Sequence, residues 1–133
     1  MAIIEGFADL GLLALRIALG AVFIYHGLPK LRNSGAMAKA MGFPAVAILL
    51  LGAVEALGGL ASLAGFWTQI AGIGLAVVML GALYHKLAKW KVPFSAHDKM
   101  GWEFDLVLLA GAIALVALGA GAYSADAMLG LWP

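Results

Sequence analysis

The chain has 133 residues, of which 65% are hydrophobic and 11% charged, with a formal net charge of +1 and a mean hydropathy of +1.05. Soluble domains are about 45–50% apolar and about 25% charged, and a chain this short has too much surface to hide so much apolar material from water. The composition therefore excludes an ordinary water-soluble domain and indicates one all-α membrane domain over residues 1–133. The absence of cysteine excludes disulfides, thiol catalysis and thiolate-bound metals.

Four apolar stretches are long enough to cross a bilayer core of about 30 Å, which takes about 20 residues of helix. They are residues 10–28, 44–65, 66–86 and 102–122. The segment before the first stretch is acidic and lacks the basic start of a cleaved signal peptide, so we expect this stretch to remain as a span. The second and third stretches meet at a short turn, which makes them antiparallel neighbours. The sequence thus predicts a bundle of four transmembrane helices.

Seven of the eight Lys and Arg residues lie in two predicted loops: Lys30, Arg32 and Lys39 in the first, and Lys86, Lys89, Lys91 and Lys99 in the second. By the positive-inside rule both loops are cytoplasmic and both termini lie outside, as expected for a multi-pass protein of the cell inner (plasma) membrane. Lysines beside membrane spans are ordinary topology signals or lipid contacts, so we expect no nucleic-acid partner.

A short motif recurs at the ends of the first and third spans. Residues 25–30 read YHGLPK and residues 84–89 read YHKLAK. Because these two spans run in the same direction, the motif predicts that His26 and His85 lie at similar depth. Two helix pairs related by an axis along the membrane normal would produce this pattern.

Arg16 and Glu55 are charged residues inside predicted spans. At 1.5 Å per residue they lie about 18 Å and about 16 Å from the cytoplasmic side. A lone charge at mid-membrane costs at least about 2.5 kcal/mol, so we expect the two to form an intramembrane charged pair. Such a pair either fixes the helix register or relays protons or substrate, and both readings stay open.

A second polar group gathers toward the cytoplasmic side: His26, His85, Glu103 and Asp105. Histidine and carboxylate together can ligate a metal, relay protons or bind a quinone carbonyl. The alternative is an interfacial belt without chemistry. We treat these residues as a candidate quinone or proton site, expect no metal, and predict that His26, His85 and Glu103 line one pocket. His97 lies in a loop, where we expect it to be solvated.

Five segments together resemble the DoxX family of small four-helix membrane proteins. Residues 15–23 read LRIALGAVF, residues 26–31 HGLPKL, residues 52–59 GAVEALGG, residues 101–106 GWEFDL and residues 119–126 GAGAYSAD. The resemblance implies a membrane subunit of an oxidoreductase system, similar to the membrane part of thiosulfate:quinone oxidoreductase. It also implies that any sulfur-oxidising catalytic domain is a separate polypeptide.

Our leading interpretation is a membrane subunit of a redox complex that interacts with quinone and with a separate oxidoreductase partner, without a covalently bound cofactor. The alternatives are a non-enzymatic scaffold or membrane anchor and a small-molecule transporter. No catalytic residue is assigned. Abundant small residues in the spans favour self-association into a homo-oligomer.

Overall fold

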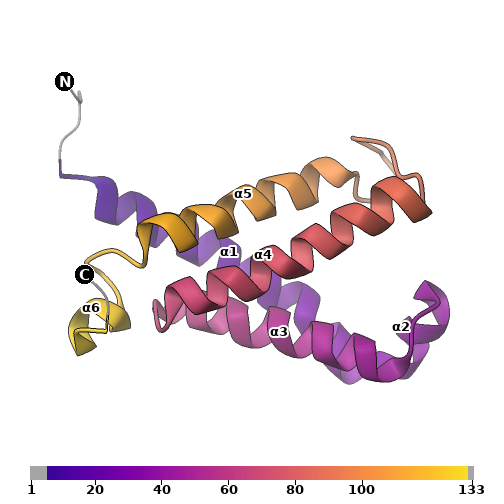
Figure 1. Cartoon of the computed structure of the whole chain (residues 1–133), viewed down its shortest axis with the longest axis horizontal. Helices are drawn as coiled ribbons and strands as arrows, with labels where there is room; N and C mark the ends of the chain where they lie inside the picture. The colour runs from indigo at the N-terminus through magenta and orange to yellow at the C-terminus, as the bar shows by residue number, and fades with distance from the viewer. Residues whose placement is uncertain (1–5, 132–133) are drawn as a thin grey trace.

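The structure is a computed structural model that describes residues 6–131, and within that range all regular structure is helical (Figure 1). In chain order the helices are α1 (Ala8–Arg32), α2 (Ser34–Met41), α3 (Ala45–Ala64), α4 (Thr68–Tyr84), the π-helical turn η1 (His85–Lys89), α5 (Trp102–Leu118) and α6 (Ala125–Leu129). The all-α prediction is confirmed for these residues.

Three helices are long and apolar enough, by length and composition, to cross a membrane: Ala8–Arg32, Ala45–Ala64 and Thr68–Lys89. The fourth predicted span, 102–122, is shorter than expected. Its helix, α5, has 17 residues and rises about 26 Å. It ends where Gly119 takes a left-handed φ of 76°. The first predicted span is longer than expected, because α1 continues through Pro29 to Arg32.

Helices α1 and α3 form an antiparallel hairpin whose backbones touch. A Cβ built on Gly20 would lie 2.8 Å from the Gly59 carbonyl oxygen, and one on Gly52 would lie 3.0 Å from the Gly27 carbonyl oxygen. Small residues allow membrane helices to approach this closely, which gains van der Waals contact where water supplies no driving force. The glycines therefore set the distance between α1 and α3.

Helices α4 and α5 form a second antiparallel hairpin, and Gly72 allows their close approach. A Cβ on Gly72 would lie 2.9 Å from Val116 Cγ2 and 3.1 Å from the Ala112 carbonyl oxygen. The two hairpins are joined by a tight turn in which Gly65 has a φ of 68° and Trp67 a φ of 46°.

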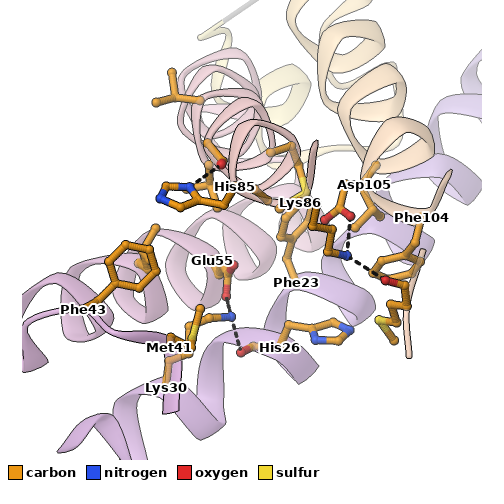
Figure 2. Close-up of a pocket in the computed structure, with 18 of the residues that line it drawn as sticks. Phe23, His26, Lys30, Met41, Phe43, Glu55, His85, Lys86, Phe104 and Asp105 are labelled. Carbon is orange, nitrogen blue, oxygen red and sulfur yellow. Dashed lines mark hydrogen bonds and ion pairs between the residues drawn. The ribbon is translucent and has the colours of Figure 1, made fainter. Parts of the chain in front are cut away.

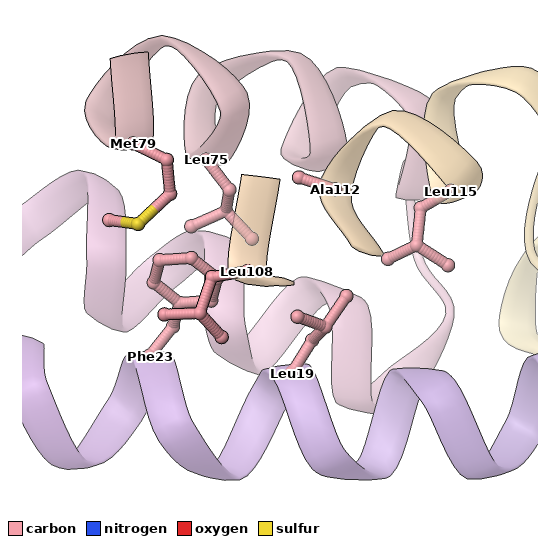
Figure 3. Close-up of a cluster of buried hydrophobic side chains, with 7 residues drawn as sticks. All are labelled: Leu19, Phe23, Leu75, Met79, Leu108, Ala112 and Leu115. Carbon is pink, nitrogen blue, oxygen red and sulfur yellow. The ribbon is translucent and has the colours of Figure 1, made fainter. Parts of the chain in front are cut away.

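The core lies where the two hairpins meet (Figure 3). It consists of buried side chains from α1, α4 and α5: Leu19, Phe23, Leu75, Met79, Leu108, Ala112 and Leu115. The outer faces are apolar as well, since Leu57 is 67% exposed and Val77 63% exposed. Such a continuous apolar exterior requires a lipid or protein environment.

Candidate functional site

A cavity of about 450 Å³ lies at the end of the bundle that carries the basic segments (Figure 2). Its walls come from the end of α1, the beginning of α3, the end of α4 with η1, and the beginning of α5. Most lining side chains are apolar, and a small set of polar ones is placed among them. The size and the character of this cavity are those of small-molecule sites, which are commonly 300–1,000 Å³.

The first polar group of the cavity is an ion pair between α1 and α3. Lys30 Nζ lies 2.6 Å from Glu55 Oε2, and the two side chains are only 13% and 6% exposed. Lys30 Nζ also donates to the carbonyl oxygen of His26, one turn earlier, at 3.1 Å. The carboxylate is thus satisfied by the last turn of α1, and the pair is neutral as a unit.

The second polar group is an ion pair within the other hairpin. Lys86 Nζ lies 2.5 Å from Asp105 Oδ2, with side-chain exposures of 16% and 7%, and it also donates to the Met100 carbonyl oxygen at 3.3 Å. Lys86 belongs to the π turn η1, which is marked by a hydrogen bond from Trp90 N to the His85 carbonyl oxygen at 2.8 Å. The wider turn redirects the side chains that follow α4, and such turns are frequent at functional sites.

His26 and His85 both line this cavity, as predicted. The ring of His26 packs against Phe104 at a centroid distance of 5.6 Å. His85 Nδ1 lies 2.8 Å from the Gly81 carbonyl oxygen, and its ring packs against Phe43 at 5.0 Å. Because a carbonyl oxygen only accepts, Nδ1 carries the proton, and in the neutral ring Nε2 is left as the acceptor.

The two carboxylates predicted at the start of α5 have different positions. Asp105 is buried and lines the cavity, whereas Glu103 is partly exposed and is not among the lining residues. Residues two apart on a helix point to roughly opposite sides, so only one of the two can face the bundle interior. The prediction that Glu103 lines the pocket is therefore wrong, and Asp105 takes that place. His97 is exposed in the loop between η1 and α5.

The predicted pairing of Arg16 with Glu55 is also wrong. A Cβ on Gly27 would lie 3.0 Å from Glu55 Cβ, so Glu55 is level with Gly27. Arg16 is eleven residues, or about 16 Å, farther along the helix. The first span was counted from residue 28, whereas α1 extends to Arg32, and these four residues account for about 6 Å of the offset. The rest arises because Gly52 lies beside Lys30, so α3 begins beyond the end of α1.

Arg16 binds backbone oxygens at the opposite end of the bundle. Its guanidinium is buried and donates to the carbonyl oxygens of Ser62 at 3.0 Å, Leu63 at 3.2 Å, Ala120 at 2.7 Å and Tyr123 at 2.9 Å. Ser62 and Leu63 lie in the last turn of α3, where carbonyl groups lack helical partners and the helix dipole favours a cation. Arg16 therefore caps α3 and ties it to the segment after α5.

Asp126 lies at the same end of the bundle as Arg16 and caps the N-terminus of α4. Its carboxylate accepts from the backbone N–H of Trp67 at 2.7 Å and of Thr68 at 3.0 Å, at the start of α4. The N–H of Asp126 donates to the Gly65 carbonyl oxygen at 2.8 Å. A carboxylate is favourable at a helix N-terminus for the same reason that a cation is favourable at a C-terminus. Sequence reasoning missed this role, because the capping signal at Ser124 marks the start of α6 and indicates nothing about α4.

The residues 6–131 contain no group of three or more His, Asp or Glu side chains that could hold a metal ion. The buried polar side chains of the described residues lie at the two ends of the bundle. One end has the cavity with two ion pairs and two histidines, and the other has the closed cluster of Arg16 and Asp126.

Comparison with known proteins agrees with the resemblance noted in the sequence. The sequence model of the DoxX family matches residues 11–98, which include both cavity histidines and the Lys30–Glu55 pair. A protein of Bacillus subtilis (strain 168) named "Putative oxidoreductase CatD" is 31% identical over 114 residues, covering 84% of this chain and 81% of that protein. No solved structure matches the chain. The family match covers more than half of the chain, which therefore belongs to the DoxX family.

Proposed function

We propose that this protein is a membrane subunit of a redox complex and that its cavity binds the headgroup of a quinone. One observation carries the proposal: two lysine–carboxylate pairs and two imidazoles face a single cavity that is otherwise apolar. The oxidoreductase name of the Bacillus relative supports the redox assignment.

The hydrogen-bond donors of the cavity suit a quinone, which is flat, neutral and carries carbonyl acceptors. An ammonium group has three N–H donors. Lys30 donates one to Glu55 and one to the His26 carbonyl oxygen, whereas Lys86 donates one to the Met100 carbonyl oxygen and forms an ion pair with Asp105 without a hydrogen bond to Oδ2. Each lysine keeps at least one donor for a ligand.

The charges of the cavity favour a neutral ligand over an anion. Each ammonium group is balanced by a carboxylate within the same hairpin, so the two pairs add no net charge to the walls. An anionic ligand would have to compete with two buried carboxylates for the same lysines, at a large desolvation cost. A quinone carbonyl needs only the remaining donors.

Bound quinone would supply the electron acceptor, and this chain would supply binding and protons. Full reduction of a quinone takes two electrons and two protons. The electrons would come from a separate oxidoreductase polypeptide. His26 and His85 line the cavity, and histidine exchanges protons near neutral pH.

We also propose that α5 is a fourth span and that the cavity end faces the cytoplasm. The hairpin with α4, in close contact through Gly72, brings α5 back along the whole length of the bundle (Figure 1). The basic segments between α1 and α3 and between α4 and α5 lie at the cavity end, so the positive-inside rule puts that end in the cytoplasm and both termini outside.

Ligand analysis of the purified protein tests the quinone assignment. We expect solvent extraction and mass spectrometry to recover quinone from the detergent-solubilised protein, and added quinone to bind. The double variant Lys86→Gln/Asp105→Asn removes the charged donor without leaving an unpaired charge. It should bind quinone about tenfold or more weakly, the effect of losing one charge-assisted hydrogen bond.

Lys89→Gln is the matched control, because Lys89 is an exposed lysine of the same π turn that does not line the cavity. It should bind quinone as the unaltered protein does. A protein that neither retains nor binds quinone would refute the assignment. Solute flux into liposomes would then favour a transporter, and a partner-dependent role without ligand would favour a scaffold.

A further inference from the structure

Helices α3 and α4 pack side by side, and two contacts bound the part of their seam that lies at the cavity. Near the middle of the bundle, a Cβ on Gly74 would lie 3.4 Å from Val54 Cγ1. Toward the cavity end, the rings of Phe43 and His85 are in edge contact at 5.0 Å. The helices are antiparallel, so these two contacts fix which residues face each other between them.

The cavity-lining residues between the two contacts include two pairs, Ala47 and Leu51 of α3 and Val77 and Gly81 of α4. Each pair is spaced four residues apart and so lies on one face of its helix. The antiparallel register puts Leu51 opposite Val77 and Ala47 opposite Gly81. Ala47 and Gly81 have the smallest side chains of the four, so the least material separates the cavity from the outer surface at this position.

The cavity reaches the outer surface of the bundle through this part of the seam. Val77 lines the cavity and is also 63% exposed. Gly81 is exposed, and a Cβ built on it would have no neighbouring atom within 4 Å. The adjoining outer surface is apolar, since Leu50 is 63% exposed and Leu80 56% exposed. By length and composition both helices could span a membrane, and the apolar surface around the opening suits lipid rather than water.

We propose that the α3–α4 seam between Phe43 and Val54 is a side portal through which the cavity takes ligands directly from the membrane. The ligand class is a lipid-dissolved amphiphile whose neutral headgroup reaches the two ion pairs and whose aliphatic tail lies in the seam at Gly81. This inference rests on the proposed quinone function and adds the route of entry. Trp90 packs on His85 at 5.5 Å and extends the aromatic closure at the cavity end, so the tail leaves toward the bilayer.

Gly81→Leu tests the portal by filling the opening. The residue is helical and has free space around its Cβ position, and leucine favours a helix more than glycine does, so the fold is retained. Gly11→Leu is the matched control, because Gly11 is also helical, also has no atom within 4 Å of a Cβ, and does not line the cavity. Binding is measured for a quinone with a long alkyl tail and for the same headgroup without a tail.

We expect Gly81→Leu to weaken binding of the tailed quinone by about tenfold or more, the size of an ordinary overpacking penalty. Binding of the tailless headgroup should stay close to that of Gly11→Leu. Equal weakening of both ligands, or of neither, would overturn the portal while leaving the quinone function intact. Failure of the unaltered protein to bind either ligand would refute the quinone function itself, and the portal with it.

Discussion

Gly65 leaves the space that the Arg16 guanidinium occupies. A Cβ on Gly65 would lie 2.8 Å from Arg16 Cζ, and the left-handed φ of 68° at this position also favours glycine. The close approach lets the guanidinium reach the last turn of α3 and the segment after α5 together. The turn between the hairpins and the buried arginine therefore depend on each other.

Because Arg16 and Glu55 do not contact each other, substituting each residue alone and both together tests this arrangement directly. Arg16→Met would leave four carbonyl oxygens without their charged donor, and we expect a loss of about 3 kcal/mol or more in the free energy of unfolding. Glu55→Gln should also destabilise the protein by weakening the contact with Lys30. Because the two residues lie about 16 Å apart along the bundle, their losses should add within about 0.5 kcal/mol.

Denaturation of the purified protein in a fixed detergent measures these losses for the two single variants and the double variant. Arg32→Met is the control, since Arg32 is exposed at the end of α1 and should contribute little. Partial recovery in the double variant would mean that Arg16 and Glu55 do interact, contrary to the structure.

The glycine contacts between α1 and α3 predict how alanine substitutions at two glycines change the free energy of unfolding. A Cβ on Gly27 would lie 2.6 Å from Ala56 N, which is backbone and cannot move aside as a flexible side chain would. Gly27→Ala should therefore push the helices apart and cost about 1–3 kcal/mol. Gly11→Ala, where a Cβ has free space, should be neutral or stabilise the helix by up to about 1 kcal/mol.

Thermal unfolding of both alanine variants, monitored by circular dichroism, compares the two positions. Equal midpoints for Gly27→Ala and Gly11→Ala would show that the α1–α3 contact is looser than the structure has it.

Composition and local pattern were enough to predict the four longest helices. Four apolar stretches correspond to α1, α3, α4 and α5, and the short turn at Gly65 correctly indicated antiparallel neighbours. Helix ends were less predictable. Residues 29–32 continue α1 although Pro29 lies among them, and α2 formed in a segment that looked like a loop.

The polar contacts were predictable only in part. The repeated YH motif predicted similar depths for His26 and His85, and both side chains line one cavity. The partners of charged residues depend on axial register, and two errors added up here. Residues 29–32 continue α1, and α3 begins beyond the end of α1, so that Glu55 lies level with Gly27 and pairs with Lys30 of α1 rather than with Arg16. Nothing in a single sequence indicates that Arg16 binds only carbonyl oxygens.

The capping role of Asp126 predicts a local effect on α4. Asp126→Asn keeps one acceptor oxygen but loses the charge and one of the two bonds to Trp67 and Thr68. We expect a loss of about 1–2 kcal/mol, as for other helix N-caps, together with faster amide hydrogen exchange in the first turn of α4. Asp98→Asn, at an exposed loop position, is the control and should change neither quantity. Unchanged exchange at Thr68 in Asp126→Asn would contradict the cap.

Membrane orientation is tested most cleanly with single introduced thiols, because the chain contains no cysteine. Ser95→Cys lies in the exposed segment between η1 and α5, and Met128→Cys lies in α6 at a position that is 85% exposed. With an impermeant thiol reagent added to intact cells, Met128→Cys should be labelled and Ser95→Cys should react only after the cells are opened, as the positive-inside rule requires. Labelling of Met37→Cys in α2 checks the other basic segment and should follow Ser95→Cys.

The reverse pattern would put the cavity on the outer side of the membrane. Labelling of all three positions from outside would instead remove α5 as a span, because the segments on its two sides would then lie on one face.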